Sequence, residues 1–520
     1  MSINRKLPIG IQDFEKLRTE NYLYVDKTQY LYELAMFSRP YFLGRPRRFG
    51  KSLFLSTLKA YFLGKKELFE GLAMAGLEKD WVEYPVFYID FNVESYIDIA
   101  SLYSALNTNL NILEEKWGEN ANDTTPAARF GGLIRRAYEK SGKKVVVLVD
   151  EYDKPLLGTM DNLDINDEIR TALKGFYGVL KSNDAYLRFV FLTGVTKFSK
   201  VSIFSDLNQL QDISMKEQYV GICGITEAEL IENFQPEIAT LAEKQNLTYE
   251  ETLAKLKKHY DGYHFCEDTE DIYNPFSLLN TFSSEKFKDY WYETGTPTFL
   301  VKMLKEMDFD VKTLENDVQF PVRSITDYQI EYGNPVPILY QSGYLTIKDY
   351  DSQLDEYILG YPNEEVKYGF MNNLLPVFMP KKDVWTEFSS GSFIRDLRAS
   401  NVDGFMNRLK AFFAGIPYEL NNKEEKHYQT IFYLLFTLMG EFVQAEVSSA
   451  IGRADAVVVV NDIVFIFEFK LTEKATAEDA LKQIDERKYA AQYAAGNKAI
   501  VKIGAEFSAE ERTLSRWVVG

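Results

Sequence analysis

Two segments far apart in the chain carry residue types that phosphate chemistry requires. Residues 41–52 read YFLGRPRRFGKS, an apolar run followed by an arginine-rich loop that ends in glycine, lysine and serine. Residues 452–470 begin with GRAD and end in an apolar run closed by FEFK. The first pattern predicts a phosphate-binding loop. The second predicts carboxylates and a lysine arranged for metal-assisted hydrolysis of a phosphodiester.

The first segment has the flanking elements that a phosphate-binding loop requires. Residues 40–44 form a short apolar run of strand length, and residues 53–62 repeat apolar side chains with helical spacing. Backbone N–H groups of the loop and of the helix start would hold the phosphates. Lys51 would reach the β- and γ-phosphates of ATP, and the Ser52 hydroxyl would ligate Mg²⁺.

The loop departs from the usual pattern at one position. The pattern places a glycine five residues before Gly50, where this chain has Arg45, and the nearest glycine is Gly44. The arginines of the loop suit a polyphosphate. We therefore expect Gly44, Arg48 and Gly50 to contact the nucleotide. The alternative is a basic loop that only begins a helix.

Two further apolar runs end in polar residues that phosphoryl transfer could use. Residues 145–149 are followed by Asp150 and Glu151, and residues 187–192 are followed by Thr193. In a parallel sheet these residues would meet at the ligand-binding edge. Asp150 would help to hold Mg²⁺, and Glu151 would polarise the attacking water. Thr193 would sense the γ-phosphate. The alternative for all three is capping of buried strands.

Five segments in order resemble the bacterial AAA-ATPase-like family. They are YVDKT at 24–28, RPRRFGKSL at 45–53, VDEYD at 149–153, TGVTKFS at 193–199 and SIFSDLNQLQDIS at 202–214. The resemblance covers roughly residues 5–225, and the RPRR form of the loop is typical of that family. It implies an AAA-like P-loop fold and ATP binding.

The second segment places two acidic groups and a lysine on neighbouring strands. Asp455 and Glu468 would hold Mg²⁺ or Mn²⁺ through oxygen ligands. Lys470 lies two residues after Glu468 and so faces the same side of the strand, where it can stabilise charge in the transition state. Glu425, at the start of a predicted helix, could reach the metal.

Together with Gln483 on the following helix, these residues resemble the PD-(D/E)XK nuclease superfamily over about residues 418–510. The resemblance implies a nuclease fold and metal-dependent cleavage of nucleic acid. The alternative is the same fold without activity.

We expect an α/β protein with four parts. They are an AAA-like P-loop ATPase domain with a parallel sheet at 1–225, a helical lid at 226–310, a winged-helix-like and helical connector at 311–417, and an α/β PD-(D/E)XK nuclease-like domain at 418–520. Within the connector, residues 338–343 predict a helix stopped by glycine, and residues 344–361 predict a hairpin.

The composition restricts the classes of function. The 77 acidic residues exceed the 59 basic residues, and residues 418–520 carry 16 acidic against 12 basic residues, which argues against tight nonspecific nucleic-acid binding by that region alone. Two cysteines and three histidines disfavour a disulfide framework and a histidine zinc site. The apolar runs are too short to span a bilayer. We expect a cytoplasmic protein without a membrane partner.

The resulting hypothesis is a Mg²⁺-dependent ATPase whose nucleotide state controls a nuclease acting on nucleic acid. The alternative is an ATP-dependent switch or binding protein whose nuclease fold is inactive. The sequence does not distinguish DNA from RNA, and it leaves open whether the protein is a monomer, a dimer or a ring.

Overall fold

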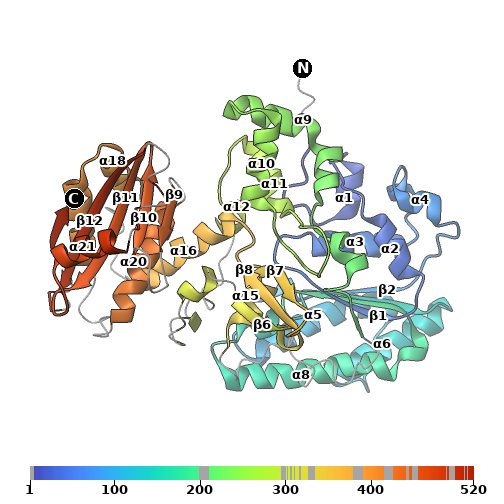
Figure 1. Ribbon diagram of the computed structural model, residues 1–520. Helices are drawn as coiled ribbons and strands as arrows, with labels where there is room; N and C mark the ends of the chain where they lie inside the picture. Colours follow the sequence, from blue (N-terminus) through green and yellow to red (C-terminus); the bar gives the residue numbers. More distant parts are fainter. Residues whose placement is uncertain are drawn as a thin grey trace. The chain divides into compact units, whose positions relative to one another are not determined.

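The first of the predicted chemistries is built on a five-stranded sheet, seen in the computed structural model (Figure 1). Its strand order is β2-β3-β4-β1-β5, and all neighbouring strands are parallel. The strands are β1 Pro40–Gly44, β2 Val86–Asp90, β3 Val145–Asp150, β4 Leu187–Gly194 and β5 Gln211–Asp212. The carboxyl ends of β1, β3 and β4 lie at one edge, so the polar residues that follow these strands come together there.

The structure describes residues 5–197, 210–293, 300, 303–304, 307, 309, 311–315, 318–325, 334–378, 390–414, 425–440, 444–447, 455–487, 489–490, 493, 498–508, 510–511 and 513–520. Side chains are not described for residues 293, 312, 315, 377–378, 390, 425–429 and 444–447. By its contacts the chain divides into two compact units, one of residues 1–295 and 317–365 and the other of residues 296–316 and 366–520.

Helices cover both faces of the parallel sheet, as its continuous apolar strands require (Figure 1). One face carries α1 Phe14–Thr19, α2 Thr28–Ala35 and α3 Lys51–Phe62, and the other carries α5 Ile99–Trp117, α6 Pro126–Ser141 and α8 Leu163–Ser182. Side chains cap the long helices: Asp98 begins α5 with a reciprocal capping box, and Thr125 caps α6 just before a proline.

A helical region follows the sheet and packs against the amino-terminal segment. It consists of α9 Glu227–Gln245, α10 Tyr249–Tyr260, α11 Pro275–Ser284 and α12 Tyr290–Glu293. Capping boxes at Thr226 and Thr248 begin the first two helices. Their buried residues, Leu230 and Phe234 among them, form one apolar cluster with Leu23 and Val25. The N-terminal segment and the helical region therefore share a core.

A small antiparallel sheet of order β6-β8-β7 completes the first unit. Its elements are β6 Val318–Pro321, α14 Val322–Ile325, α15 Val336–Gln341, β7 Thr346–Asp351 and β8 Glu356–Gly360. The helix and the hairpin expected at 338–361 are therefore present, with Gly343 at φ 89° after the helix. The winged-helix interpretation and the four domain limits stay predictions.

The second unit is built on a mixed sheet of order β13-β12-β11-β10-β9 (Figure 1). Only β11 and β12 are parallel, and the other neighbouring strands are antiparallel. The strands are β9 Gln444–Val447, β10 Ala456–Val460, β11 Ile463–Leu471, β12 Ala499–Ser508 and β13 Thr513–Val519. The helices are α18 Ser390–Arg398, α19 Val402–Ala414, α20 Glu425–Met439 and α21 Ala477–Glu486.

Alternation along β11 separates the two faces of this sheet. Phe467 packs against Phe405 of α19 and Phe436 of α20, whereas Ile466 shares an apolar cluster with Ile484 of α21. A P-loop-type parallel sheet followed by a nuclease-like mixed α/β sheet confirms the expected fold class.

The remaining α-helices are α4 Ala73–Leu77, α7 Lys154–Gly158 and α16 Glu364–Phe378. The 3-10 turns are η1 Lys66–Phe69, η2 Phe91–Val93, η3 Asp184–Tyr186, η4 Glu217–Ile222 and η5 Val311–Glu315. Within the described residues, every helix is too short or too polar to pass through a bilayer.

Candidate nucleotide and nuclease sites

The predicted phosphate-binding loop joins β1 to α3. The strand ends at Gly44 and the helix begins at Lys51, so the loop has the strand–loop–helix context that the sequence predicts. Gly50 precedes the helix with φ 93°, a conformation that glycine adopts without a Cβ penalty. Among the described residues no side chain caps α3, and the N–H groups of its first turn have no partner within the helix. A helix start of this kind suits an anion.

Lys51 is a buried lysine in the first turn of α3. Its Nζ donates to the carbonyl oxygens of Arg45 at 2.9 Å and Pro46 at 3.1 Å. Burial lowers the pKa of Lys51, while the carboxylates of Glu151 and Asp153 act in the opposite direction. The ammonium group thus stabilises the loop from within and lies next to the acidic residues that follow β3.

The two loop arginines at positions 45 and 48 have different surroundings. The Arg45 guanidinium is buried, donates to the carbonyl oxygens of Ser214 at 2.5 Å and Tyr219 at 3.1 Å, and lies 4.1 Å from the centre of the Phe265 ring. Its guanidinium is directed at the protein interior and does not line the cavity beside the loop. Arg48 is exposed at φ 68° and lies 5.0 Å from the Phe276 ring.

The residues predicted to follow β3 and β4 come together at one edge of the sheet. The Thr193 hydroxyl donates to Oδ1 of Asp150 at 2.7 Å, and Tyr88 donates to Oδ2 at 3.2 Å. This contact follows from the strand order, because β4 lies between β3 and β1. Thr193 therefore lies on the strand between the two that lead into the phosphate loop and the Asp150–Glu151 pair, and its role as a γ-phosphate sensor stays a prediction.

The backbone changes direction at Glu151, directly after β3 ends. Its φ of 50° is uncommon for a residue with a side chain and is a form of backbone strain often found at functional sites. Asp153, two residues later, is buried and accepts hydrogen bonds from the N–H groups of Val195 at 2.9 Å and Thr196 at 2.6 Å. The turn after β3 is thus fixed to the end of β4.

A cavity of about 550 Å³ opens beside the loop and is large enough for a nucleotide. Its polar wall includes Arg48, Gly50, Lys51, Ser52 and Glu151. Its apolar wall includes Ile11, Leu23, Val25, Phe234, Phe276 and Leu279. Three of the predicted nucleotide contacts are not part of this lining: Gly44, Asp150 and Thr193. They lie behind the residues that form the cavity surface.

Sequence reasoning missed the residues that support the loop from outside. Phe49 packs edge-on against Tyr263 and Phe265, with ring centres 4.8 and 5.7 Å away. The indole Nε1 of Trp291 donates to the carbonyl oxygen of Arg47 at 3.0 Å. The Tyr263 and Phe265 rings both belong to the YDGYHF run at 260–265, which packs against the phosphate loop through them.

The predicted nuclease residues lie on β10, β11 and α21. Glu468 is buried, and its Oε1 accepts hydrogen bonds from Lys470 Nζ at 2.9 Å and from the Gln483 side-chain amide. Asp455 comes just before β10 and accepts from the N–H of Phe469 at 2.7 Å. Burial, and next the negative charge of Glu468, raise the pKa of Asp455 to about 6. The structure therefore brings all four side chains together.

This cluster fits a divalent cation in one specific respect. Oε2 of Glu468 is buried and has no hydrogen-bond partner among the described residues, an arrangement that is costly without a ligand. A cation would satisfy that oxygen and relieve the repulsion between Glu468 and Asp455. Within the described side chains, no three His, Cys, Asp or Glu residues form a metal-binding group. Glu425 begins α20, but its side chain lies outside the described part.

Comparisons with known proteins find a family for each of the two regions that hold these sites. Residues 8–204 match the family described as "Predicted AAA-ATPase", and residues 423–517 match the "PD-(D/E)XK nuclease superfamily". An "Uncharacterized protein in vnfD 5'region" of Azotobacter chroococcum mcd 1 is 38% identical over an alignment of 524 positions that covers 99% of each chain. The solved structure of the Aeropyrum pernix ORC2 protein (ADPNP–ADP complexes) shares 11% identity over 67% of this chain and 88% of that chain. Its TM-score of 0.22 is too low to support an inference.

Proposed function

The chain belongs to the AAA-ATPase-like family and ends in a domain of the PD-(D/E)XK nuclease superfamily, and we propose that it is an ATPase controlling a metal-dependent nuclease. ATP would bind in the first unit, and its hydrolysis would regulate cleavage of nucleic acid by the second. The observation that carries the ATPase part is the convergence of Lys51, Ser52 and Glu151 on one cavity, with the Thr193–Asp150 contact directly behind.

Each residue of the first site has a role that its position supports. Lys51 leaves the Arg45 and Pro46 carbonyl groups to bind the β- and γ-phosphates, for which its location at the helix start is suited. Ser52 from the cavity wall and Asp150 from behind it would supply oxygen ligands for Mg²⁺, which would neutralise phosphate charge. Glu151 orients the attacking water. Thr193 holds the Asp150 carboxylate in place.

In the second site, Asp455 and Glu468 would hold Mg²⁺ or Mn²⁺. Oε2 of Glu468, which is buried and has no hydrogen-bond partner among the residues that the structure describes, supports this assignment. Such a cation polarises a phosphodiester and activates water when it is bound. Lys470, fixed by Oε1 of Glu468, would stabilise negative charge on the phosphate as the bond breaks. The assignment of Glu425 as a further ligand is part of this proposal.

Nucleic acid is the partner that this chemistry requires, and the net charge of −18 predicts that its binding depends on the bound cation more than on basic side chains. A cytoplasmic location agrees with two buried free thiols, Cys223 and Cys266.

The test is cleavage of labelled single- and double-stranded DNA and RNA by the full chain with Mg²⁺ or Mn²⁺, with and without ATP. Phosphate release is measured in the same samples. Wild type is compared with Lys51→Ala and Glu468→Ala. We expect Lys51→Ala to abolish phosphate release and alter cleavage, and Glu468→Ala to abolish cleavage alone. Phosphate release without cleavage of any substrate would refute the nuclease part and favour an ATP-dependent switch with an inactive nuclease fold.

A further inference from the structure

The helix that delivers Gln483 to the candidate nuclease site lies unusually close to the sheet. α21 packs over β12 at Gly504. A Cβ at that position would lie 2.7 Å from the backbone nitrogen of Leu481 and still closer to the carbonyl oxygen of Ala477. Position 504 therefore allows the helix backbone to rest directly on the strand.

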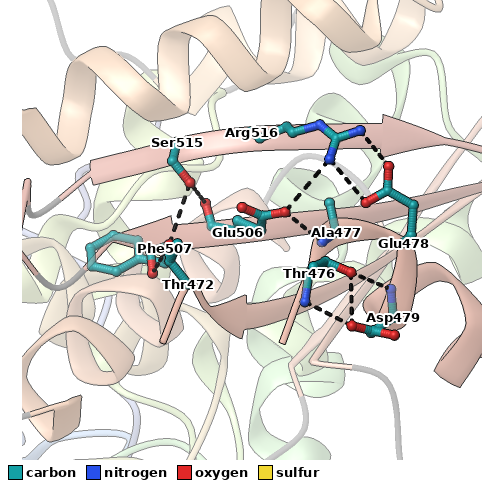
Figure 2. A network of polar contacts seen from close by, with 9 residues as sticks. All are labelled: Thr472, Thr476, Ala477, Glu478, Asp479, Glu506, Phe507, Ser515 and Arg516. Carbon is teal, nitrogen blue, oxygen red and sulfur yellow. Dashed lines mark hydrogen bonds and ion pairs between the residues drawn. The ribbon is translucent and has the colours of Figure 1, made fainter. Parts of the chain in front are cut away.

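The start of this helix is tied to the sheet by Glu506, two residues beyond Gly504 and so on the same face. Oε1 of Glu506 accepts a hydrogen bond at 2.8 Å from the N–H of Ala477, the first residue of α21 (Figure 2). Arg516, paired with Glu506 on β13, lies 4.0 Å from that carboxylate and bonds both oxygens of Glu478 (Figure 2). A carboxylate that is only 12% exposed thus accepts the first N–H of a helix whose start is also capped by Thr476 and Asp479.

Gln483 lies six residues further along the helix, about 9 Å along its axis. Its amide donates to Oε1 of Glu468 and to the Tyr489 hydroxyl at 3.3 Å. The ammonium group of Lys470 donates a hydrogen bond to the same carboxylate oxygen. Oε1 is therefore saturated, and Oε2 has no hydrogen-bond partner within the part of the chain that the structure describes. Which oxygen of Glu468 remains available depends on where α21 places Gln483.

We propose that Glu506 is a positioning residue of the nuclease site. By accepting the N–H of Ala477 it sets the position of α21 on β12, which holds Gln483 against Oε1 of Glu468 and keeps Oε2 directed to the metal. Arg516 supports this role by holding Glu506 and Glu478 together. The inference rests on the metal binding by Glu468 proposed above.

The test is calorimetric titration of the full chain with Mn²⁺. Removing the acceptor in Glu506→Ala is expected to weaken Mn²⁺ binding about tenfold, the usual effect of losing a residue that orients a ligand. Glu506→Gln keeps an oxygen that accepts the Ala477 N–H and should bind Mn²⁺ like wild type. Glu506→Asp, which withdraws the acceptor by one methylene group, should show the loss if Glu506→Ala does not fold.

Lys502→Ala is the matched control, because Lys502 also ties β12 to α21 through an ion pair with Asp485 at 2.6 Å but lies away from the helix start. It should leave Mn²⁺ binding unchanged. Melting in EDTA checks that each variant is folded. Wild-type Mn²⁺ affinity in Glu506→Ala, or an equal loss in Lys502→Ala, would overturn the positioning role while leaving the nuclease proposal standing. Absence of Mn²⁺ binding by wild type, or unchanged binding in Glu468→Ala, would overturn both.

Discussion

The raised pKa of Asp455 makes a prediction about stability that does not require a substrate. Its carboxyl group is held at a pKa of about 6 by burial and by the neighbouring Glu468, against an ordinary value of 3.8. In the unfolded chain the group loses its proton near pH 4. In the folded protein it keeps the proton until about pH 6. Between these values the folded state binds more protons than the unfolded state, so stability falls as pH rises.

The size of the effect follows from the shift. A difference of about two pKa units lowers the free energy of unfolding by about 3 kcal/mol. This loss is absent below pH 4 and complete above pH 6. Asp455→Asn removes the charge and keeps an oxygen that can accept the N–H of Phe469. We therefore expect this variant to stabilise the metal-free second unit by up to about 3 kcal/mol at pH 7.5, and hardly at all at pH 4.

The measurement is amide hydrogen exchange of peptides from β10 and β11, because the two compact units need not unfold together. Wild type and Asp455→Asn are compared in EDTA at several pH values, after correction for intrinsic exchange rates. In parallel, Mn²⁺ affinity of wild type should fall about tenfold per pH unit below pH 6, because protons compete for the carboxylate. An equal stability gain at pH 4 and pH 7.5, or no gain at either, would refute the reasoning.

Three predictions concern the first unit. Trp291→Phe removes the hydrogen bond to the Arg47 carbonyl, worth about 1 kcal/mol, and should weaken binding of a fluorescent ATP analogue about fivefold. Gly50→Ala puts a Cβ at φ 93°, a strain of about 1 to 2 kcal/mol, and should weaken the same binding about tenfold. Thr193→Val keeps the side-chain shape but removes the donor to Asp150, so kcat for ATP should fall about tenfold while nucleotide affinity is unchanged.

Each of these three predictions can be contradicted by a specific result. For Trp291→Phe and Gly50→Ala, that result is an unchanged dissociation constant for the ATP analogue in a variant that melts like wild type. Nucleotide binding by the loop would then not depend on the substituted residue. For Thr193→Val it is a loss of affinity with unchanged kcat, which would make the hydroxyl a binding group. Tyr103→Phe, at an exposed side chain away from the cavity lining, serves as the control for all three.

Much of both sites could be read from local sequence. Gly50, Lys51 and Ser52 are adjacent, and the strand, loop and helix around them follow from hydrophobic spacing and glycine geometry, which are local properties. Glu468 and Lys470 share a face because side chains alternate along a strand. Because successive side chains point to opposite faces of a strand, the continuous apolar runs before Asp150 and Thr193 predicted strands that are buried on both faces.

Only the tertiary structure decided which of these residues meet. Strand order brings Thr193 onto Asp150, although 43 positions separate them. Burial turns the Arg45 charge inward, toward carbonyl groups some 170 residues away in the chain. Trp291, which supports the loop from outside, is still more distant, 244 positions from Arg47. Such contacts depend on which faces pack together, a choice made by the whole core, and no local pattern of charge or periodicity encodes it.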